Sequence, residues 1–109
     1  MAYDEELEAR IAGVLAGQPG LVSKKMFGGV AFLVQGNMAC GVHKDMLMVR
    51  VGPDAYDRAM QEPHTRQFDL TGRVMKGWVT VDPGGISSQA DLERWVQTGL
   101  EFALTLSPK

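Results

Sequence analysis

Hydrophobic residues near the start of the chain follow the period of an α-helix. Leu7, Ile11 and Val14 are spaced by three or four residues, so they share one helical face. Asp4 can accept hydrogen bonds from the free amides of the first turn, and Gly17 can end the last turn. The pattern predicts a helix that begins after Asp4 and ends before Gly17.

The helical period is lost between residues 22 and 51, where short apolar runs alternate with turn-forming residues. Gly36-Asn37 has the chemistry of a two-residue hairpin turn, which requires positive φ angles, and Lys44-Asp45 is a weaker signal of the same kind. The pattern predicts four strands, at residues 23–27, 30–35, 38–43 and 46–51.

The second half of the chain combines signals for a short helix with signals for extended segments. Pro53 can occupy the first turn of a short helix through residue 60. Residues 66–70 and 74–81 have the composition of extended segments, and Thr71-Gly72 can form the turn between them.

The last element is predicted to be a long helix. Ser88 and Asp91 resemble a capping box at its start. Gly99 weakens an isolated helix, which indicates that it permits close approach to the sheet. The apolar stripe of this helix comprises Leu92, Trp95, Val96, Gly99, Leu100 and Ala103. The order of elements predicts an α+β fold. In it, a mainly antiparallel sheet of about five to six strands packs against N-terminal and C-terminal helices, with a short helix inserted after the fourth strand.

The two tight turns predict the register of the hairpins. A turn centred on Gly36-Asn37 places Leu33 opposite Cys40, and a turn centred on Lys44-Asp45 places Cys40 opposite Val49. One face is then uniformly apolar and is expected to pack beneath the helices: Ala31, Leu33, Met38, Cys40, Val42, Leu47, Val49 and Val51. The other face carries Val30, Phe32, Val34, Ala39, Gly41, His43, Met46, Met48 and Arg50.

This second face is too apolar for an ordinary solvated surface, although it carries His43 and Arg50. Another element can cover it, a second copy of the chain can bury it, or it can bind a partner. A protein partner would contact Phe32, Met48 and Arg50. A small molecule or anion would instead use Lys25, His43 and Arg50.

Composition narrows the class of protein. The chain has 109 residues with ordinary hydrophobic and charged fractions of 45% and 22%, which fits a single domain over residues 1–109. Its net charge of −2, and a final helix richer in acidic than basic residues, disfavour direct nucleic-acid binding. No apolar run is long enough to span a membrane and the first residues are acidic, so we expect no membrane association and a cytoplasmic protein.

Catalytic and cofactor motifs are not found in the sequence. Cys40 and His43 are three residues apart on one predicted strand, so their side chains are expected on opposite faces. One cysteine and two histidines cannot form a Cys/His zinc quartet. There is also no phosphate-binding loop or nucleophile motif. We therefore expect a non-enzymatic domain with no cofactor and no metal.

A basic pair lies in the first predicted strand. Lys24 and Lys25, together with Arg50 and Arg73, either form a small cationic patch for an anion or a carboxylate, or protect an edge strand from association. The protective role is the favoured interpretation.

The stretch from Lys25 through Met26-Phe27-Gly28-Gly29 to Phe32 resembles the N-terminal domain family of TfoX, the bacterial competence regulator. The strand ending in Arg50-Val51 and the aromatic Trp78 and Trp95 extend the resemblance over nearly the whole chain. It implies an α+β fold, no established catalysis, and an interaction or regulatory role linked to competence and transcription control. In the Met-Phe-Gly-Gly segment, the two glycines are expected to act structurally, by supplying a positive φ, a bulge or a tight reversal.

Overall fold

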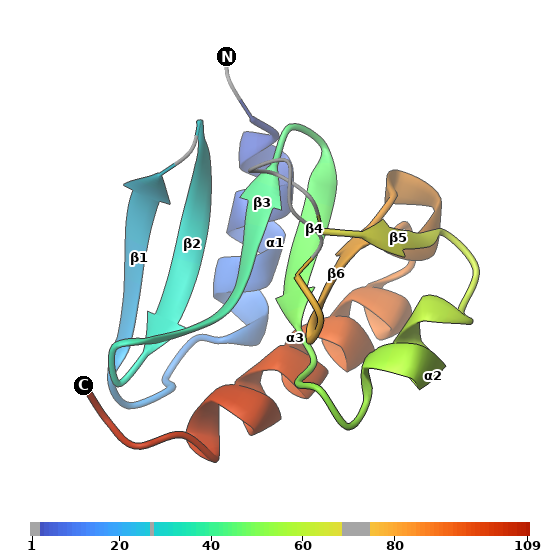
Figure 1. Cartoon of the computed structure of the whole chain (residues 1–109). Helices are drawn as coiled ribbons and strands as arrows, with labels where there is room; N and C mark the ends of the chain where they lie inside the picture. Colours follow the sequence, from blue (N-terminus) through green and yellow to red (C-terminus); the bar gives the residue numbers. More distant parts are fainter. Residues whose placement is uncertain (1–2, 27, 69–74) are drawn as a thin grey trace.

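A computed structural model of the chain describes residues 3–26, 28–68 and 75–109, and it shows an α+β fold (Figure 1). A six-stranded antiparallel sheet has the order β1-β2-β3-β4-β6-β5. Its strands are β1 (Leu21–Met26), β2 (Gly29–Val34), β3 (Asn37–His43), β4 (Met46–Arg50), β5 (Thr65–Gln67) and β6 (Trp78–Val81). The helices are α1 (Glu5–Val14), the short α2 (Tyr56–Met60) and α3 (Gln89–Leu104), with a 3₁₀ turn, η1 (Pro83–Gly85), before α3. The predicted fold class is confirmed, including the short helix after the fourth strand.

The two long helices begin where the sequence predicts. The Asp4 carboxylate accepts hydrogen bonds from the amides of Glu6 and Leu7, both at 3.0 Å. The Ser88 hydroxyl accepts one from the Asp91 amide at 3.1 Å. These caps satisfy amides that the first helical turn leaves without intrahelical partners. All six residues of the predicted stripe on α3 are buried.

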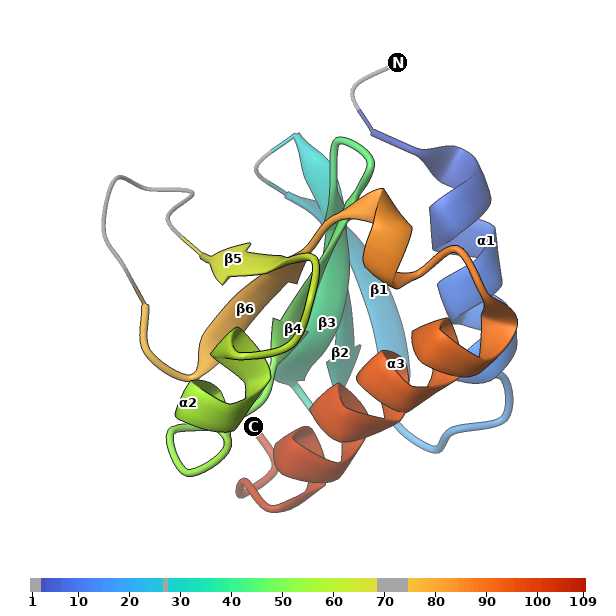
Figure 2. The same ribbon diagram turned by 90° about the vertical axis from the view of Figure 1, so that its right-hand side faces the viewer.

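Helices α1 and α3 cover the same face of the sheet, as Figure 2 shows from the side. The core lies between this helical layer and the sheet, and it includes Ile11, Val49 and Leu92, each fully buried. At Gly99 a Cβ atom would clash with the carbonyl oxygen of Ala39 on β3. The prediction that Gly99 permits close approach of the last helix to the sheet is therefore confirmed.

The turn between β2 and β3 differs from the prediction. It is centred on Gln35-Gly36 rather than Gly36-Asn37, because Val34 pairs with Asn37 and the φ angles of Gln35 and Gly36 are +55° and +85°. Two positive φ angles are the signature of a type I′ hairpin turn. Asn37 is instead a buried strand residue whose side-chain amide donates to the Ser107 carbonyl at 2.9 Å.

A β-bulge follows the turn and changes which face β2 presents to the helices. Leu33 pairs with Met38 whereas Phe32 pairs with Cys40, so Ala39 is an extra residue without a partner in β2. Relative to the predicted pairing with β3, Leu33 is displaced by two positions and Phe32, beyond the bulge, by one. A displacement by one position exchanges the two faces of a strand, so β2 presents the opposite face to the helices.

The exchange of faces overturns part of the predicted surface. Phe32 lies in the core with 2% of its surface exposed, and Val30 and Val34 lie there too. Leu33, predicted to be in the core, is half-buried, and it lies with Ala31 on the face away from α1 and α3, hereafter the outer face. Met38, also predicted in the core, brings its methyl group to the outer side of Gly41.

The β3–β4 hairpin has the predicted register. Cys40 pairs with Val49 and His43 pairs with Met46 across the Lys44-Asp45 turn. The predicted faces of β3 beyond the bulge and of Met46 to Val49 in β4 are therefore correct, with Met46 and Met48 on the outer face. Arg50, at the end of β4, reaches Phe102 of α3.

The last two strands are shorter than predicted. Residues 75–77 form a turn before β6, with Gly77 at a φ of +96°. The parts of the predictions that fall on Phe27, on residues 69–70, on the Thr71-Gly72 turn and on residues 73–74 lie outside the described residues.

Candidate functional site

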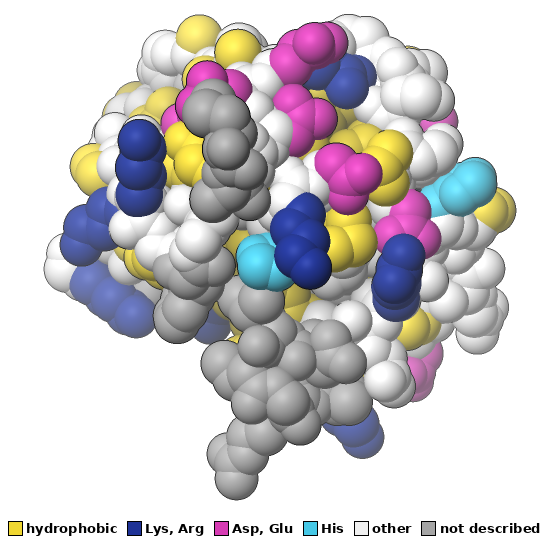
Figure 3. Space-filling model, turned by 90° about the horizontal axis from the view of Figure 1, so that it is seen from above, with side chains coloured by type: hydrophobic (Ala, Val, Ile, Leu, Met, Phe, Trp, Pro, Cys, Tyr) yellow, Lys and Arg dark blue, Asp and Glu magenta, His cyan; other side chains and the backbone are white. Residues whose placement is uncertain are grey.

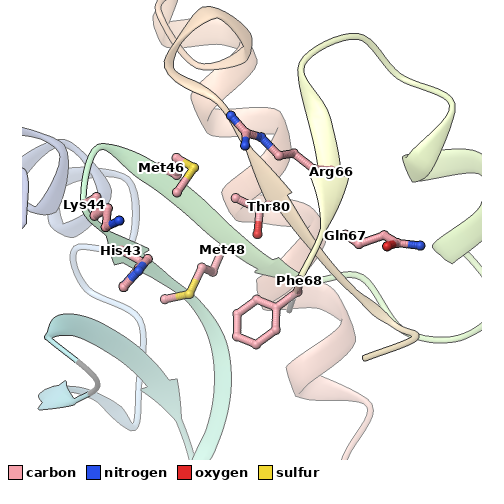
Figure 4. Close-up of a pocket in the computed structure, with 8 residues that line it drawn as sticks. All are labelled: His43, Lys44, Met46, Met48, Arg66, Gln67, Phe68 and Thr80. Carbon is pink, nitrogen blue, oxygen red and sulfur yellow. The ribbon is translucent and has the colours of Figure 1, made fainter. Parts of the chain in front are cut away.

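A hollow of about 290 Å³ opens on the outer face of the sheet (Figure 4). It lies where β3, β4, β6 and the end of β5 meet. Its lining is His43, Lys44, Met46, Met48, Arg66, Gln67, Phe68 and Thr80. In Figure 4 the Gln67 side chain points away from the others, as the pairing of Gln67 with the core residue Val79 requires.

The floor of the hollow is apolar. Met48 is 5% exposed and Phe68 is 8% exposed, and the Phe68 ring packs against Trp78 with ring centroids 5.3 Å apart. A Cβ atom at Gly41 would lie 3.0 Å from the methyl carbon of Met38 and 3.1 Å from that of Met48. The absence of a side chain at Gly41 thus lets two flexible thioethers close over the middle of the sheet.

The rim of the hollow is polar and carries positive charge. Lys44 is exposed in the β3–β4 turn. Arg66 forms an ion pair with Asp82 at 2.7 Å. Nδ1 of His43 is buried and has no hydrogen-bond partner among the described residues. A buried polar atom without a partner is costly, so it is a natural point for a donor or acceptor from outside.

The structure separates the five predicted binding residues. His43 and Met48 line the hollow. Phe32 is in the core, so the expectation that it faces outward is wrong. Lys25 is exposed on β1 opposite Val30, a core residue, and therefore lies on the other side of the sheet from His43.

Arg50, the fifth residue, is held by two aromatic rings. Its guanidinium carbon lies 5.5 Å from the ring centroids of both Trp78 and Phe102. Such contacts stabilise a cation against the ring faces. They link the end of β4 to α3, so the structure gives Arg50 a packing role, and Lys25, His43 and Arg50 do not converge on one site.

The comparison with known families decides the affiliation of the chain. The family described as TfoX N-terminal domain matches residues 14–103. The chain belongs to the TfoX N-terminal domain family. A search of curated proteins returned no match. Membership of the TfoX N-terminal domain family points to a competence-related regulatory domain, and this type of family is not known to be enzymatic.

The glycines by which the sequence resembles the TfoX N-terminal domain family have a structural explanation. Met26 pairs with Gly29, and Gly28 has a φ of +73° in the reversal between β1 and β2. A Cβ atom at Gly29 would clash with the carbonyl oxygen of Val42. Of the expected roles, the positive φ is confirmed for Gly28, whereas Gly29 is needed for the close approach of the Val42 carbonyl.

Most of the hollow's lining could not be predicted from the sequence. No binding role was predicted for Lys44, Arg66 or Thr80, because the pairing of β6 between β4 and β5 is a long-range feature that turn chemistry does not reveal. The pairing of Arg66 with Thr80, and of Thr80 with Met48, brings these residues to one face.

Cys40 lies on the opposite side of β3 from His43, as predicted. It is fully buried, and burial raises the pKa of its thiol to about 12. A thiol with such a pKa does not supply a thiolate near neutral pH. No group of three or more metal-ligating side chains is found in the part of the chain that the structure describes. Within the same residues, no helix is long and apolar enough to cross a membrane.

Proposed function

We propose that this domain is a regulatory binding module that acts by holding a protein partner in the hollow on the outer face of its sheet, in the control of competence or transcription. The observation that carries the proposal is the hollow itself, with Met48 and Phe68 as its floor. Family membership supports the regulatory character.

The chemistry of the hollow suits a protein segment that combines an apolar side chain with a polar or acidic neighbour. Methionine side chains adapt their shape to an inserted apolar group. Lys44 at the rim favours an acidic neighbour, and Nδ1 of His43 offers a polar contact that the described residues leave unused.

The proposal is tested by affinity capture from the native cell with the wild-type domain and two variants. Met46→Glu places a charge in the hollow at a half-buried position, so we expect it to lose the captured protein while the domain stays folded. Leu104→Glu is the matched control, because Leu104 is 46% exposed on α3 and belongs to another surface. A protein that all three forms recover equally contradicts the assignment of the hollow.

A second candidate function is the binding of a small anionic ligand, and Nδ1 of His43 favours it, since no described residue forms a hydrogen bond with this atom. The site would use His43 and Lys44 instead of the predicted set of Lys25, His43 and Arg50. Thermal-shift measurements with simple carboxylates and nucleotides test this function, because a ligand that binds the folded state raises the melting temperature. We expect such a shift to disappear in His43→Ala, and a shift that is unchanged in this variant places the ligand elsewhere.

A further inference from the structure

Strand β1 forms one edge of the sheet, and the hydrogen-bonding edge that it turns away from β2 is open along six residues. Among the residues that the structure describes, it pairs with β2 only, so the backbone groups of every second residue point away from the sheet. Its four central residues are all exposed, among them Val22 with 52% of its surface exposed. The opposite edge, β5, has only three residues, and its Arg66 is paired with Asp82. Of the two edges, β1 is the one long enough to receive another strand.

The charges on β1 are both positive, and they lie on both sides of the sheet. Lys24 pairs with Ala31 on the outer face, whereas Lys25 pairs with Val30 on the face of the helical layer. Neither lysine forms an ion pair with any residue that the structure describes. In Figure 3, Lys and Arg side chains gather at the left-hand border, which is the side of β1 in Figure 1.

We propose that β1 accepts an extended acidic segment of another protein as a seventh strand of the sheet. Backbone hydrogen bonds along the open edge would hold the segment, as in other cases of strand addition. Adjacent residues of a strand point to opposite faces, so two consecutive acidic residues would meet Lys24 and Lys25 on the two sides of the sheet. Val22 lies on the outer face like Lys24, so it would contact an apolar side chain of the segment two positions from the acidic residue that meets Lys24.

Charge complementarity distinguishes this occupant from a second copy of the chain. Pairing two β1 strands around a two-fold axis would bring four lysines together, and like charges across neighbouring strands are destabilising. The proposal concerns an edge and residues other than those of the hollow, so it stands independently of the proposed function.

The test uses a blocked six-residue peptide, Val-Thr-Glu-Glu-Thr-Val, titrated into the ¹⁵N-labelled domain. We expect chemical-shift changes concentrated on β1 and slower hydrogen exchange of those β1 amides that point away from β2. The same peptide with alternate backbone nitrogens methylated keeps its charges and loses its hydrogen bonds on one edge. We expect it to bind at least about tenfold more weakly. Equal binding of the methylated peptide, or binding without slower exchange on β1, overturns the proposal.

Two variants of the domain complete the test. The double substitution Lys24→Glu and Lys25→Glu changes exposed side chains only, and we expect it to weaken binding of the peptide about tenfold or more. Arg58→Glu with Lys76→Glu is the matched control, since it makes the same charge change at exposed positions outside both β1 and the hollow. Equal loss in both variants means attraction by net charge alone and overturns the proposal. Sedimentation that shows a dimer abolished by the β1 variant also overturns it, because the occupant would then be a second copy.

Discussion

At the scale of single residues, burial and neighbouring groups decide what each reactive or charged side chain can do. Cys40 is enclosed in the core and keeps its proton. The guanidinium group of Arg50 packs against the rings of Trp78 and Phe102. His43, on the same strand as Cys40, has a buried nitrogen with no hydrogen-bond partner in the described part of the chain, and it borders the hollow. Of these three side chains, only that of His43 is therefore placed to take part in binding at the hollow.

The raised pKa of Cys40 predicts a loss of stability in alkaline solution. The thiol has a pKa of about 12 in the folded protein, against 9.0 for an ordinary cysteine. Between these two pH values the unfolded chain releases this proton and the folded chain keeps it, so the unfolded state gains stability as pH rises. The free energy of unfolding should fall through this group by up to about 1.4 kcal/mol per pH unit.

Denaturant unfolding at a series of pH values, for wild type and Cys40→Ala, measures this contribution. We expect the stability difference between the two proteins to change in favour of Cys40→Ala as pH rises above about 9. A difference that stays constant over this range contradicts a buried, protonated thiol.

At the scale of elements, close packing of a helix on the sheet depends on one missing side chain. Gly99 is buried in α3 where the helix meets Ala39, whereas Gly13 in α1 has no atom within 4 Å of the position of a Cβ. Helix propensity favours alanine at both positions, but only Gly99 has a neighbour that opposes it. The same substitution should therefore have opposite effects in the two helices.

We expect Gly99→Ala to lower the free energy of unfolding by about 1–3 kcal/mol, because the helix must move away from β3. Gly13→Ala should raise it by about 0.5–1 kcal/mol, because alanine is the better helix former. Chemical denaturation of both variants provides the measurement. A Gly99→Ala protein as stable as wild type would mean that α3 does not approach the sheet as closely as described.

The β2–β3 hairpin shows how far sequence reasoning reaches. The caps of α1 and α3, the stripe of α3 and the β3–β4 register depend on local chemistry, and the sequence predicts them correctly. The register of β2 depends on a bulge at Ala39 and on the burial of Asn37 against Ser107, seventy positions away in the chain. Turn residues carry no signal for such contacts. Of the five predicted binding residues, Phe32 was misplaced by that register, which put it on the outer face.

Two alanine substitutions in β2 discriminate between the two registers. Phe32→Ala should cost about 3–5 kcal/mol of stability, because it leaves a cavity in the core. Leu33→Ala should cost clearly less, because Leu33 is half-buried on the outer face. Thermal or denaturant unfolding would show the reverse order if the turn were centred on Gly36-Asn37.

At the scale of the whole molecule, the two faces of the sheet have different roles. One face and the helices α1 and α3 form the core, and the other face closes partly over itself with Met38, Met48 and Phe68. This division leaves the hollow beside His43 as a surface that folding does not fill. Our central claim is that a regulatory partner fills it.

Hydrogen exchange with and without the captured partner tests this claim most directly. The account predicts that amides around Met46 and Met48 in β4 and around Thr80 in β6 exchange more slowly in the complex, with little change in α1 and α3. Slower exchange confined to the exposed surface of α1 and α3, with the amides of β4 and β6 unchanged, would contradict it.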